Sequence, residues 1–473
     1  TRPSATRATS DESGSGSGVF RVLAQKAQWC FGLLHRHGLG GQLARGSLSS
    51  FIVKLSSTAL GFALTMVLAR VLGVEGLGVY AYVYSFLSLL AVPAQLGLTT
   101  LVVRETAYAR TRSNWALLKG VWRWAGTFVA IFSLALCLLS AAVVYFSADR
   151  FTGEQLKTFW WGVLLVPVIA LGNVRGAALR GLRRVLLGTL PEHVLRPALF
   201  IASLLATSLV VPDERLSPSA AMLLHVVSGA GAFLIGGFFL WRARPTSLSG
   251  IAPTYESRSW LRSLIPLGLV AALQASNKYL DILILGYLGT AADVGIYRIA
   301  VQGAMLVAFG SQAISIVVSP YIAHIYAQGD RNKLQAVVTA TARAVLCTAL
   351  PVVAVFVIFG AELLALFFGE EFSQGGTALA ILATGRFIAA AMGPSAALLS
   401  MSRHEGQAAK AGAIAAVCGL ALNFLLIPRF GVNGAATATA VGFIGWHIAM
   451  RSYALRSVGV DTLPFRLWKA RSS

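Results

Sequence analysis

The chain consists of about twelve hydrophobic stretches of about 20 residues each, separated by short loops that alternate in charge. A helix of that length crosses roughly the 30 Å of hydrocarbon in a lipid bilayer. Loops rich in Lys and Arg alternate with loops that carry mainly Asp and Glu, along the whole chain. Cytoplasmic loops of membrane proteins are enriched in Lys and Arg, so this alternation predicts an orientation as well as a class. We expect an all-α integral membrane protein with both termini in the cytoplasm.

The hydrophobic pattern predicts the spans and their grouping. Spans are predicted over residues 47–71, 77–101, 120–147, 156–179, 185–211, 219–241, 261–288, 294–322, 341–368, 375–401, 408–427 and 432–455. We expect two six-helix lobes, over 47–241 and 261–456, joined by a cytoplasmic linker over 242–260. A disordered tail with an amphipathic segment over 1–46, and a basic tail over 457–473, are expected on the cytoplasmic side. Residues 175–184 are expected in a basic cytoplasmic loop.

The composition excludes several classes of function. Only 12% of the residues are charged and 56% are hydrophobic, so no stretch is polar enough to form a separate soluble domain. The net charge of +21 is explained by basic loops on one side of a membrane, so we expect no nucleic-acid partner. The four cysteines are isolated, and no spacing is typical of a metal site, a nucleotide-binding loop or a catalytic nucleophile. We therefore expect no enzyme activity, no metal and no cofactor, and coupling to protons or sodium ions stays open.

A short motif occurs at equivalent places in the two halves of the chain. It reads Leu72-Gly73 followed by Gly78-Val79-Tyr80 in the first copy, and Leu288-Gly289 followed by Gly295-Ile296-Tyr297 in the second. The number of predicted spans between the copies is even, so the two halves have the same orientation in the membrane. The chain is therefore expected to repeat one helical unit about an axis along the membrane normal.

Four segments combine small, apolar and glycine residues in a distinctive order. They read LARVLG…GLGVYAYVYSFLSLLAVPAQLGL, ALRGLRRVLLGTLPEHVLRP, LLALFFGEEFSQGGTALAIL and LNFLLIPRFGVNGAATATAVGF. This pattern resembles the bacterial flippases of the polysaccharide transporter family, in the multidrug/oligosaccharidyl-lipid/polysaccharide (MOP) superfamily. The resemblance covers roughly residues 47–456 and implies two six-helix lobes around a central cavity.

The resemblance also implies a cargo and a setting. The cargo is a polyprenyl-pyrophosphate-linked oligosaccharide, moved from the cytoplasmic to the outer leaflet by alternating access for cell-surface polysaccharide biosynthesis. The partners implied are membrane lipid, a polysaccharide polymerase and glycosyltransferases. The location implied is the bacterial inner membrane, which the protein crosses many times.

Charged residues inside predicted spans are the candidates for a substrate site, because a charge at the bilayer centre costs about 2.5–3.5 kcal/mol on insertion scales. The cations are Lys54, Arg196, Lys278, Arg298 and Arg386, and the acids are Glu192 and Asp281. An excess of cations fits an anionic headgroup, and Arg matches phosphate with two parallel hydrogen bonds. We predict that the five cations bind pyrophosphate and that Asp281 couples the cycle to an ion.

Some of these residues also have a structural interpretation. Lys54 lies near the end of its span, so its side chain can extend to the lipid headgroups. Glu192 and Arg196 are four residues apart and can neutralise each other, as Lys278 and Asp281 can on a neighbouring turn.

Three other functions compete with a flippase. A cation-coupled multidrug exporter of the same superfamily would need an acidic cavity for organic cations. A non-transporting scaffold for polysaccharide assembly would not need buried charge at all. A membrane-embedded glycosyltransferase would need acidic residues near a loop, and the predicted outer loops are too short to form such a site. The excess of buried cations favours the flippase.

Overall fold

The computed structural model describes residues 39–146, 151–210, 215–402 and 405–465, and within these ranges the regular structure is helical. The predicted amphipathic segment before residue 39 and the basic residues after 465 lie outside them. Residues Thr1–Ile52 and Val53–Ser473 form two compact units. The first contributes the start of helix α2, and the description below concerns the second.

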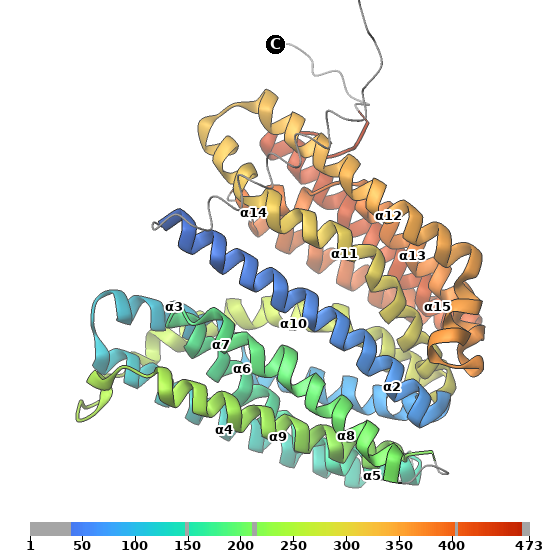
Figure 1. Cartoon of the computed structure of the whole chain (residues 1–473), viewed down its shortest axis with the longest axis horizontal. Coiled ribbons are helices and arrows are strands. Elements are labelled where there is room, and N and C mark those ends of the chain that lie inside the picture. The colour runs from blue at the N-terminus through green and yellow to red at the C-terminus, as the bar shows by residue number, and fades with distance from the viewer. Residues whose placement is uncertain (1–38, 147–150, 211–214, 403–404, 466–473) are drawn as a thin grey trace, which may run out of the picture. The chain divides into compact units, whose positions relative to one another are not determined.

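Both halves of the described chain are built from helices (Figure 1). The first half contains α2 (Leu39–Gln95), α3 (Leu98–Thr111), α4 (Trp115–Phe146), α5 (Gly153–Gly162), α6 (Leu165–Gly181), α7 (Val185–Leu190), the π-helical turn η2 (Pro191–Leu195), α8 (Arg196–Val210) and α9 (Pro218–Ala243). The second half contains η3 (Thr246–Leu248), α10 (Ser257–Leu288), α11 (Ala291–Gln328), α12 (Arg331–Phe368), η4 (Glu370–Gly375), α13 (Gly376–Ala391), α14 (Ser395–Met401) and α15 (Glu405–Val458).

Eight helices of the described ranges are long and apolar enough to cross a membrane, or nine if α13 and α14 form one bent span. Two of the eight are too long for one span. The apolar part of α2 covers 44 residues, roughly 66 Å at 1.5 Å per residue, which is about twice the hydrocarbon thickness. The backbone of α2 breaks at Gly73 (φ 69°), and that of α15 breaks at Gly431 (φ 53°). With two spans in each of these helices, with α13 and α14 counted as one bent span, and with the 32-residue α10 added, the count reaches the predicted twelve.

Some of the predicted spans contain a break in the helix. The span predicted over 77–101 ends with α2 at Gln95, where Leu96 and Gly97 take positive φ before α3 begins. The span predicted over 156–179 is divided between α5 and α6, and the one over 375–401 between α13 and α14, which meet at a bend of 45°.

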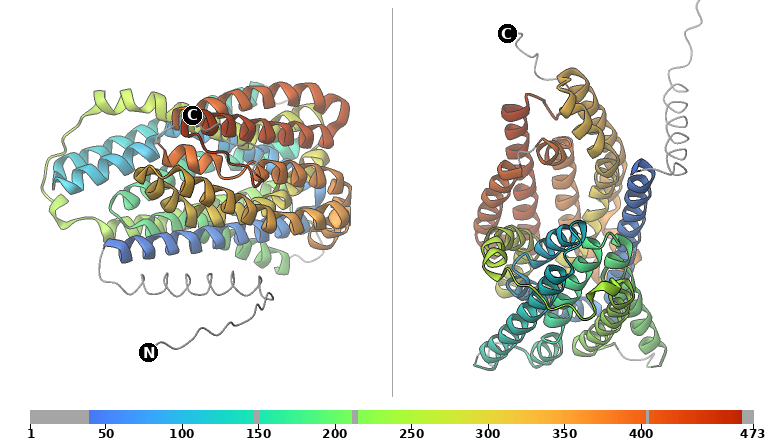
Figure 2. Two further views of the ribbon diagram at one scale, coloured as in Figure 1. Left: turned by 90° about the horizontal axis from the view of Figure 1, so that it is seen from above. Right: turned by 90° about the vertical axis from the view of Figure 1, so that its left-hand side faces the viewer.

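Neighbouring helices pack mainly within each half of the unit Val53–Ser473. In the first half α3 packs on α4 and α6, while α5, α6 and α8 pack on α9. In the second half α11, α12, α13 and α15 pack together, and α10 contacts both α15 and α3. The end-on view in Figure 2 shows helices of the two halves grouped separately. The boundaries predicted for two six-helix lobes stay predictions.

The two copies of the repeated motif meet where α2 crosses α11. A Cβ atom on Gly78 would lie 1.7 Å from the carbonyl oxygen of Ala291, and one on Gly295 would lie 2.2 Å from that of Val74. The backbone of each helix therefore occupies the space that a side chain at the glycine of the other helix would need. This explains why the motif keeps a glycine at the same position in both copies.

Further contacts between the halves lie at the same end of the helices, which carries the carboxylates Glu75, Glu154, Asp293, Glu362, Glu370 and Glu371. We call it the acidic end and the opposite one the basic end; they lie at the right and left of Figure 1. Arg215 pairs with Glu371 at 2.6 Å, and the same carboxylate accepts a hydrogen bond from the backbone of Val74. This carboxylate raises the pKa of Arg215 by hydrogen bonding and by charge. Arg70 donates to the carbonyl oxygens of Leu366 and Phe367, at the last turn of α12.

The linker predicted over 242–260 is docked on the first half. Lys119 of α4 donates to the carbonyl oxygens of Leu248 and Ile251, at 3.2 and 2.7 Å. The segment after α15 is also held: Thr462 is fully buried, and Asp461 accepts two hydrogen bonds from Arg451. The predicted basic tail therefore begins with residues that pack against the helices.

The crossing of α2 and α11 predicts a strong effect of Gly78→Ala. The added methyl group would overlap the backbone of α11, so we expect a loss of stability of about 1–3 kcal/mol. Thermal unfolding of the purified protein in detergent measures it.

Gly126→Ala is the matched control, because nothing lies within 4 Å of a Cβ atom at that position of α4. A methyl group there should leave stability unchanged or raise it by up to about 1 kcal/mol, since alanine favours a helix over glycine. Equal midpoints of thermal unfolding for Gly78→Ala and Gly126→Ala would contradict the close crossing of α2 and α11.

Candidate functional site

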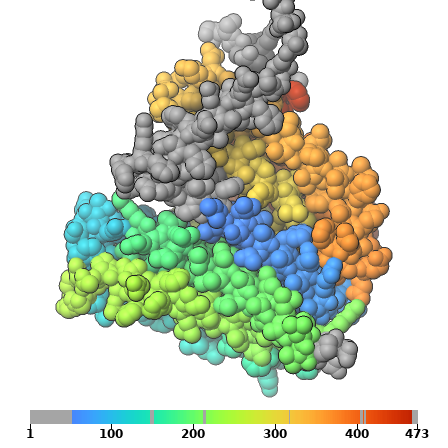
Figure 3. All heavy atoms as spheres, viewed as in Figure 1, coloured from blue at the N-terminus to red at the C-terminus, as the bar shows by residue number. Residues whose placement is uncertain are grey.

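Two adjoining cavities lie between the first and second halves. The Arg298 cavity has a volume of about 140 Å³, and the Lys278 cavity one of about 480 Å³. They share wall residues from α2 and α8, namely Gly61, Leu64, Tyr84, Arg196 and Pro197. On α2 the Arg298 cavity reaches Leu77 near the acidic end, while the Lys278 cavity reaches Ser57 and Gln95 toward the basic end. Figure 3 shows α2, in blue, between the green first half and the yellow and orange second half.

Three of the five predicted cations meet at these cavities. Arg298 of α11 lines one, Lys278 of α10 lines the other, and Arg196 of α8 lines both. The predicted polar faces also contribute, since Ser57 and Gly61 of α2 and Gln302 of α11 are wall residues. The two halves thus bring together cations that are far apart in the sequence. Their role in binding stays a prediction.

Lys54 lies apart from the cations of the cavities. Its side chain is exposed and lines neither the Arg298 cavity nor the Lys278 cavity. This exposure agrees with the structural interpretation, in which the ammonium group extends to the headgroup region.

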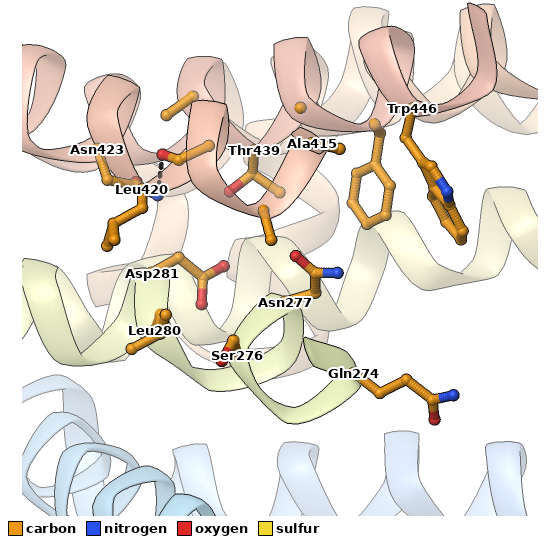
Figure 4. Close-up of a pocket in the computed structure, with 15 residues that line it drawn as sticks. Gln274, Ser276, Asn277, Leu280, Asp281, Ala415, Leu420, Asn423, Thr439 and Trp446 are labelled. Atoms are coloured by element: carbon orange, nitrogen blue, oxygen red, sulfur yellow. Dashed lines mark hydrogen bonds between the residues drawn. The ribbon is translucent and has the colours of Figure 1, made fainter. Parts of the chain in front are cut away.

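Asp281 and Arg386 lie at a third place, inside the second half. A pocket of about 230 Å³ between α10 and α15 is lined by Asp281, Asn277, Asn423, Thr439 and Phe443, among others. Figure 4 shows Asp281 and Asn277 on the side of α10 that faces α15. We call this the Asp281 pocket.

Asp281 is held by hydrogen bonds within this pocket. Tyr297 donates its hydroxyl to Asp281 at 2.6 Å and lies 2.9 Å from the hydroxyl of Thr439. The backbone N–H of Ile282 donates to the other carboxylate oxygen at 2.8 Å. The ion pairs between described residues include none between Lys278 and Asp281, whose side chains line different cavities. The suggested pairing of these two residues is therefore wrong.

Arg386 stacks on an aromatic wall of the Asp281 pocket. Its guanidinium carbon lies 4.6 Å from the ring centre of Phe443, and its charge acts on Asp281 and Tyr297. Its Nε atom is buried and has no hydrogen-bond partner among the described residues. Arg386 therefore faces the second half and not the two cavities that hold the other cations.

One charged residue of the site could not be assigned from the sequence. Arg175 was expected in a cytoplasmic loop, but it lies in α6 with its side chain only 6% exposed. Arg175 donates to Glu192 at 2.9 Å, while Arg196 lies 3.5 Å from the other oxygen of that carboxylate. Glu192 is therefore shared between two arginines instead of pairing with Arg196 alone. Residues 175 and 192 lie on different helices, so no helical spacing links them.

Buried polar aromatic groups complete the wall of the Arg298 cavity. Tyr80 lies 2.7 Å from His225 Nδ1, and the His225 ring stacks on Phe200 with ring centres 4.6 Å apart. Tyr80 and Tyr297 occupy the same position in the two copies of the repeat, and each binds a titratable side chain of its own half. The sequence shows the repeat of the tyrosines but not their partners.

No cluster of metal-ligating side chains occurs in the ranges that the structure describes. The described polar groups at the cavities are guanidinium, ammonium, hydroxyl, amide and imidazole groups. The described carboxylate at the cavities is that of Glu192, which two arginines share. Such a set is suited to binding an anion by charge and hydrogen bonding.

Two family models match the chain. The one described as "Polysaccharide biosynthesis protein" matches residues 43–326, and the one described as "Lipid II flippase MurJ" matches residues 253–471.

Two curated relatives come from the archaeon Haloferax volcanii. The probable low-salt glycan biosynthesis flippase Agl15 is 23% identical over 85% of this chain and 81% of its own length. The probable flippase AglR is 26% identical over 89% of this chain and 85% of its own length.

Solved structures share the fold. An inward-facing multidrug resistance MATE transporter of the MOP superfamily superposes with a TM-score of 0.72 at 17% identity, over 86% of this chain and 98% of the other. The lipid II flippase MurJ in an inward closed conformation superposes with a TM-score of 0.65 at 14% identity, over 87% of each chain. The chain thus has the all-α fold that these two structures share.

The hydrogen bonds of the two repeat tyrosines predict unequal effects of their removal. Tyr297→Phe takes a donor from a carboxylate and should cost about 1.5–3 kcal/mol of stability. Tyr80→Phe removes a bond between neutral groups and should cost about 0.5–1.5 kcal/mol. Thermal unfolding of both variants in detergent compares them, and an equal or smaller loss for Tyr297→Phe would contradict the assigned role.

Proposed function

Because the chain belongs to the polysaccharide biosynthesis protein family, we propose that it is a flippase for a lipid-linked glycan. The proposed cargo is a polyprenyl-pyrophosphate-linked oligosaccharide, which enters from the cytoplasmic leaflet and leaves in the outer leaflet. The names of Agl15 and AglR support flipping in glycan biosynthesis, and the matches to MurJ support a cargo of the same chemical class.

The observation that carries this proposal is the charge at the two cavities between the halves. Arg196, Arg298 and Lys278 line them, and among the described wall residues Glu192 is the one carboxylate. Arg175, which lines neither cavity, already donates a hydrogen bond to Glu192. Because this carboxylate is paired with Arg175, the cations in the cavity walls leave a positive excess. A pyrophosphate brings the negative charge and the acceptor oxygens that this excess requires. The multidrug exporter is the second candidate, supported by the MATE-like fold, but such a cavity repels organic cations.

The contacts between the halves support an order of events. At the acidic end Arg215, Glu371 and Arg70 join the halves, and we propose that these contacts close the path from the Arg298 cavity on that side. In the proposed orientation the basic end faces the cytoplasm, in agreement with the positive-inside rule. The headgroup then enters from the basic end, and release requires these contacts to separate, while the polyprenyl tail stays in the lipid. A polysaccharide polymerase and glycosyltransferases are the proposed protein partners.

The coupling ion is proposed to act at Asp281. A carboxylate can gain or lose a proton or a bound cation, whereas a guanidinium keeps its charge. Asp281 binds Tyr297 of α11, and α11 also carries Arg298, so a change at Asp281 has a direct path to the substrate cavity.

Reconstitution in liposomes with a labelled polyprenyl-pyrophosphate oligosaccharide tests the substrate site. Losing one charged hydrogen-bonding partner costs about 1.5–3 kcal/mol, so Arg298→Ala and Arg196→Ala should each reduce flipping at least about tenfold. Arg386→Ala tests whether the cation outside the two cavities also takes part.

The matched control is Arg123→Ala, which removes an exposed arginine of α4. It should flip the substrate at the rate of the unmodified protein. Equal rates for the control and both cavity variants would disprove the site.

Asp281→Asn tests the coupling, because asparagine keeps the shape but neither ionises nor attracts a cation as strongly. The variant should lose the dependence of flipping on the gradient of pH or sodium, measured in liposomes with imposed gradients. Unchanged dependence on both gradients would disprove a coupling role for Asp281.

A further inference from the structure

A buried chain of three charges, Arg175–Glu192–Arg196, lies beside the two cavities. The ion pair of Arg175 with Glu192 is the only one between described residues in which both side chains are more than nine-tenths buried. Glu192 also lines the Lys278 cavity, whose other described titratable wall residues are Arg196, Lys278, His193, Tyr84 and Tyr279. Glu192 neutralises the enclosed Arg175, and it also lies in the wall of a cavity that is proposed to bind an anion.

Arg175 is fixed in position. Its Nη2 atom donates to Glu192 at 2.9 Å, its Nη1 atom donates to the carbonyl oxygen of Phe233, and its guanidinium lies over the Phe233 ring. A Cβ atom on Gly236 would lie 2.3 Å from the guanidinium carbon, so α9 packs directly on it. Arg175 therefore holds Glu192 but cannot reach either cavity.

Arg196 is held loosely by comparison. Its Nη1 atom lies 3.5 Å from Glu192, and this atom makes no hydrogen bond with any described residue. Its side chain is 18% exposed and lines both cavities. The carboxylate thus has one permanent partner and one partner that faces the substrate space.

We infer that Glu192 is an internal counter-ion, which holds Arg196 while the cavity is empty and releases it to the anionic headgroup. Arg175 is the positioning residue that keeps the carboxylate paired after Arg196 has moved. When the headgroup leaves, Glu192 takes Arg196 back, so the carboxylate competes with the substrate and promotes its release. This inference rests on the proposed function and adds a residue that sets the affinity and the release rate.

The test compares affinity with turnover. In detergent, the full-length protein is titrated with farnesyl pyrophosphate; in liposomes, flipping of the labelled oligosaccharide lipid gives KM and kcat. Glu192→Gln keeps the shape and removes the competitor, so Kd for farnesyl pyrophosphate should fall at least about fivefold while kcat also falls. A purely structural role would not tighten binding.

Two further variants keep the test decisive. Glu192→Gln leaves the charge of Arg175 without its partner and so endangers folding, whereas Glu192→Gln combined with Arg175→Met removes both charges. This double variant should also bind more tightly than the unmodified protein. Glu154→Gln is the matched control, because it removes a surface carboxylate paired with Lys157, and it should leave Kd and kcat unchanged.

Each outcome separates this inference from the proposed function. Tighter binding with slower turnover in the folded Glu192 variants supports the counter-ion. Unchanged or weaker binding in them overturns it, and the proposed site survives if Arg196→Ala weakens binding. If Arg196→Ala binds farnesyl pyrophosphate as well as the unmodified protein does, both the site and the counter-ion are wrong.

Discussion

A charge inside an apolar bundle must be paired, stacked or placed beside a polar cavity, because desolvation otherwise penalises it heavily. The described helices use all three solutions. Arg175 is paired and enclosed, Arg386 is stacked on Phe443, and Arg298 faces a cavity between the halves. The cations that face cavities are the ones left with capacity to bind an anion. The arrangement of the halves follows this division, since the cavities form where the helices that carry these cations meet.

The internal repeat gives the two halves related frameworks with different polar contents. The glycines of the two motifs allow α2 and α11 to cross at backbone distance. Two residues further on, Tyr80 and Tyr297 turn into their own halves, where one binds an imidazole and the other a carboxylate. One half therefore presents an imidazole beside the arginines of the two cavities, and the other an acid in a separate pocket beside Arg386. The same helical scaffold thus separates anion binding from a candidate for ion coupling.

Much of the fold could be predicted from the sequence, but the partners of the buried charges could not. Hydrophobic length and loop charge are local properties, so the spans and the positive charge within them could be predicted. Whether Arg196 pairs with Glu192 depends on Arg175, which lies on another helix and was assigned to a loop. The separation of Lys278 from Asp281 depends on how α10 rotates between α2 and α15, which spacing along one helix does not determine. The breaks after Gln95 and Ala391 were missed because apolar residues continue across them.

The last turn of α12 depends on a side chain from the opposite half. A helix leaves its final carbonyl groups without internal partners, and Arg70 of α2 supplies donors to two of them at Leu366 and Phe367. If the halves part at the acidic end, these two exposed carbonyls lose their donors. Water must then reach the end of α12 as Arg70 withdraws, so hydration of this helix terminus is part of the opening step itself. The outward motion of such a protein should accordingly be sensitive to anything that dries or wets this small region.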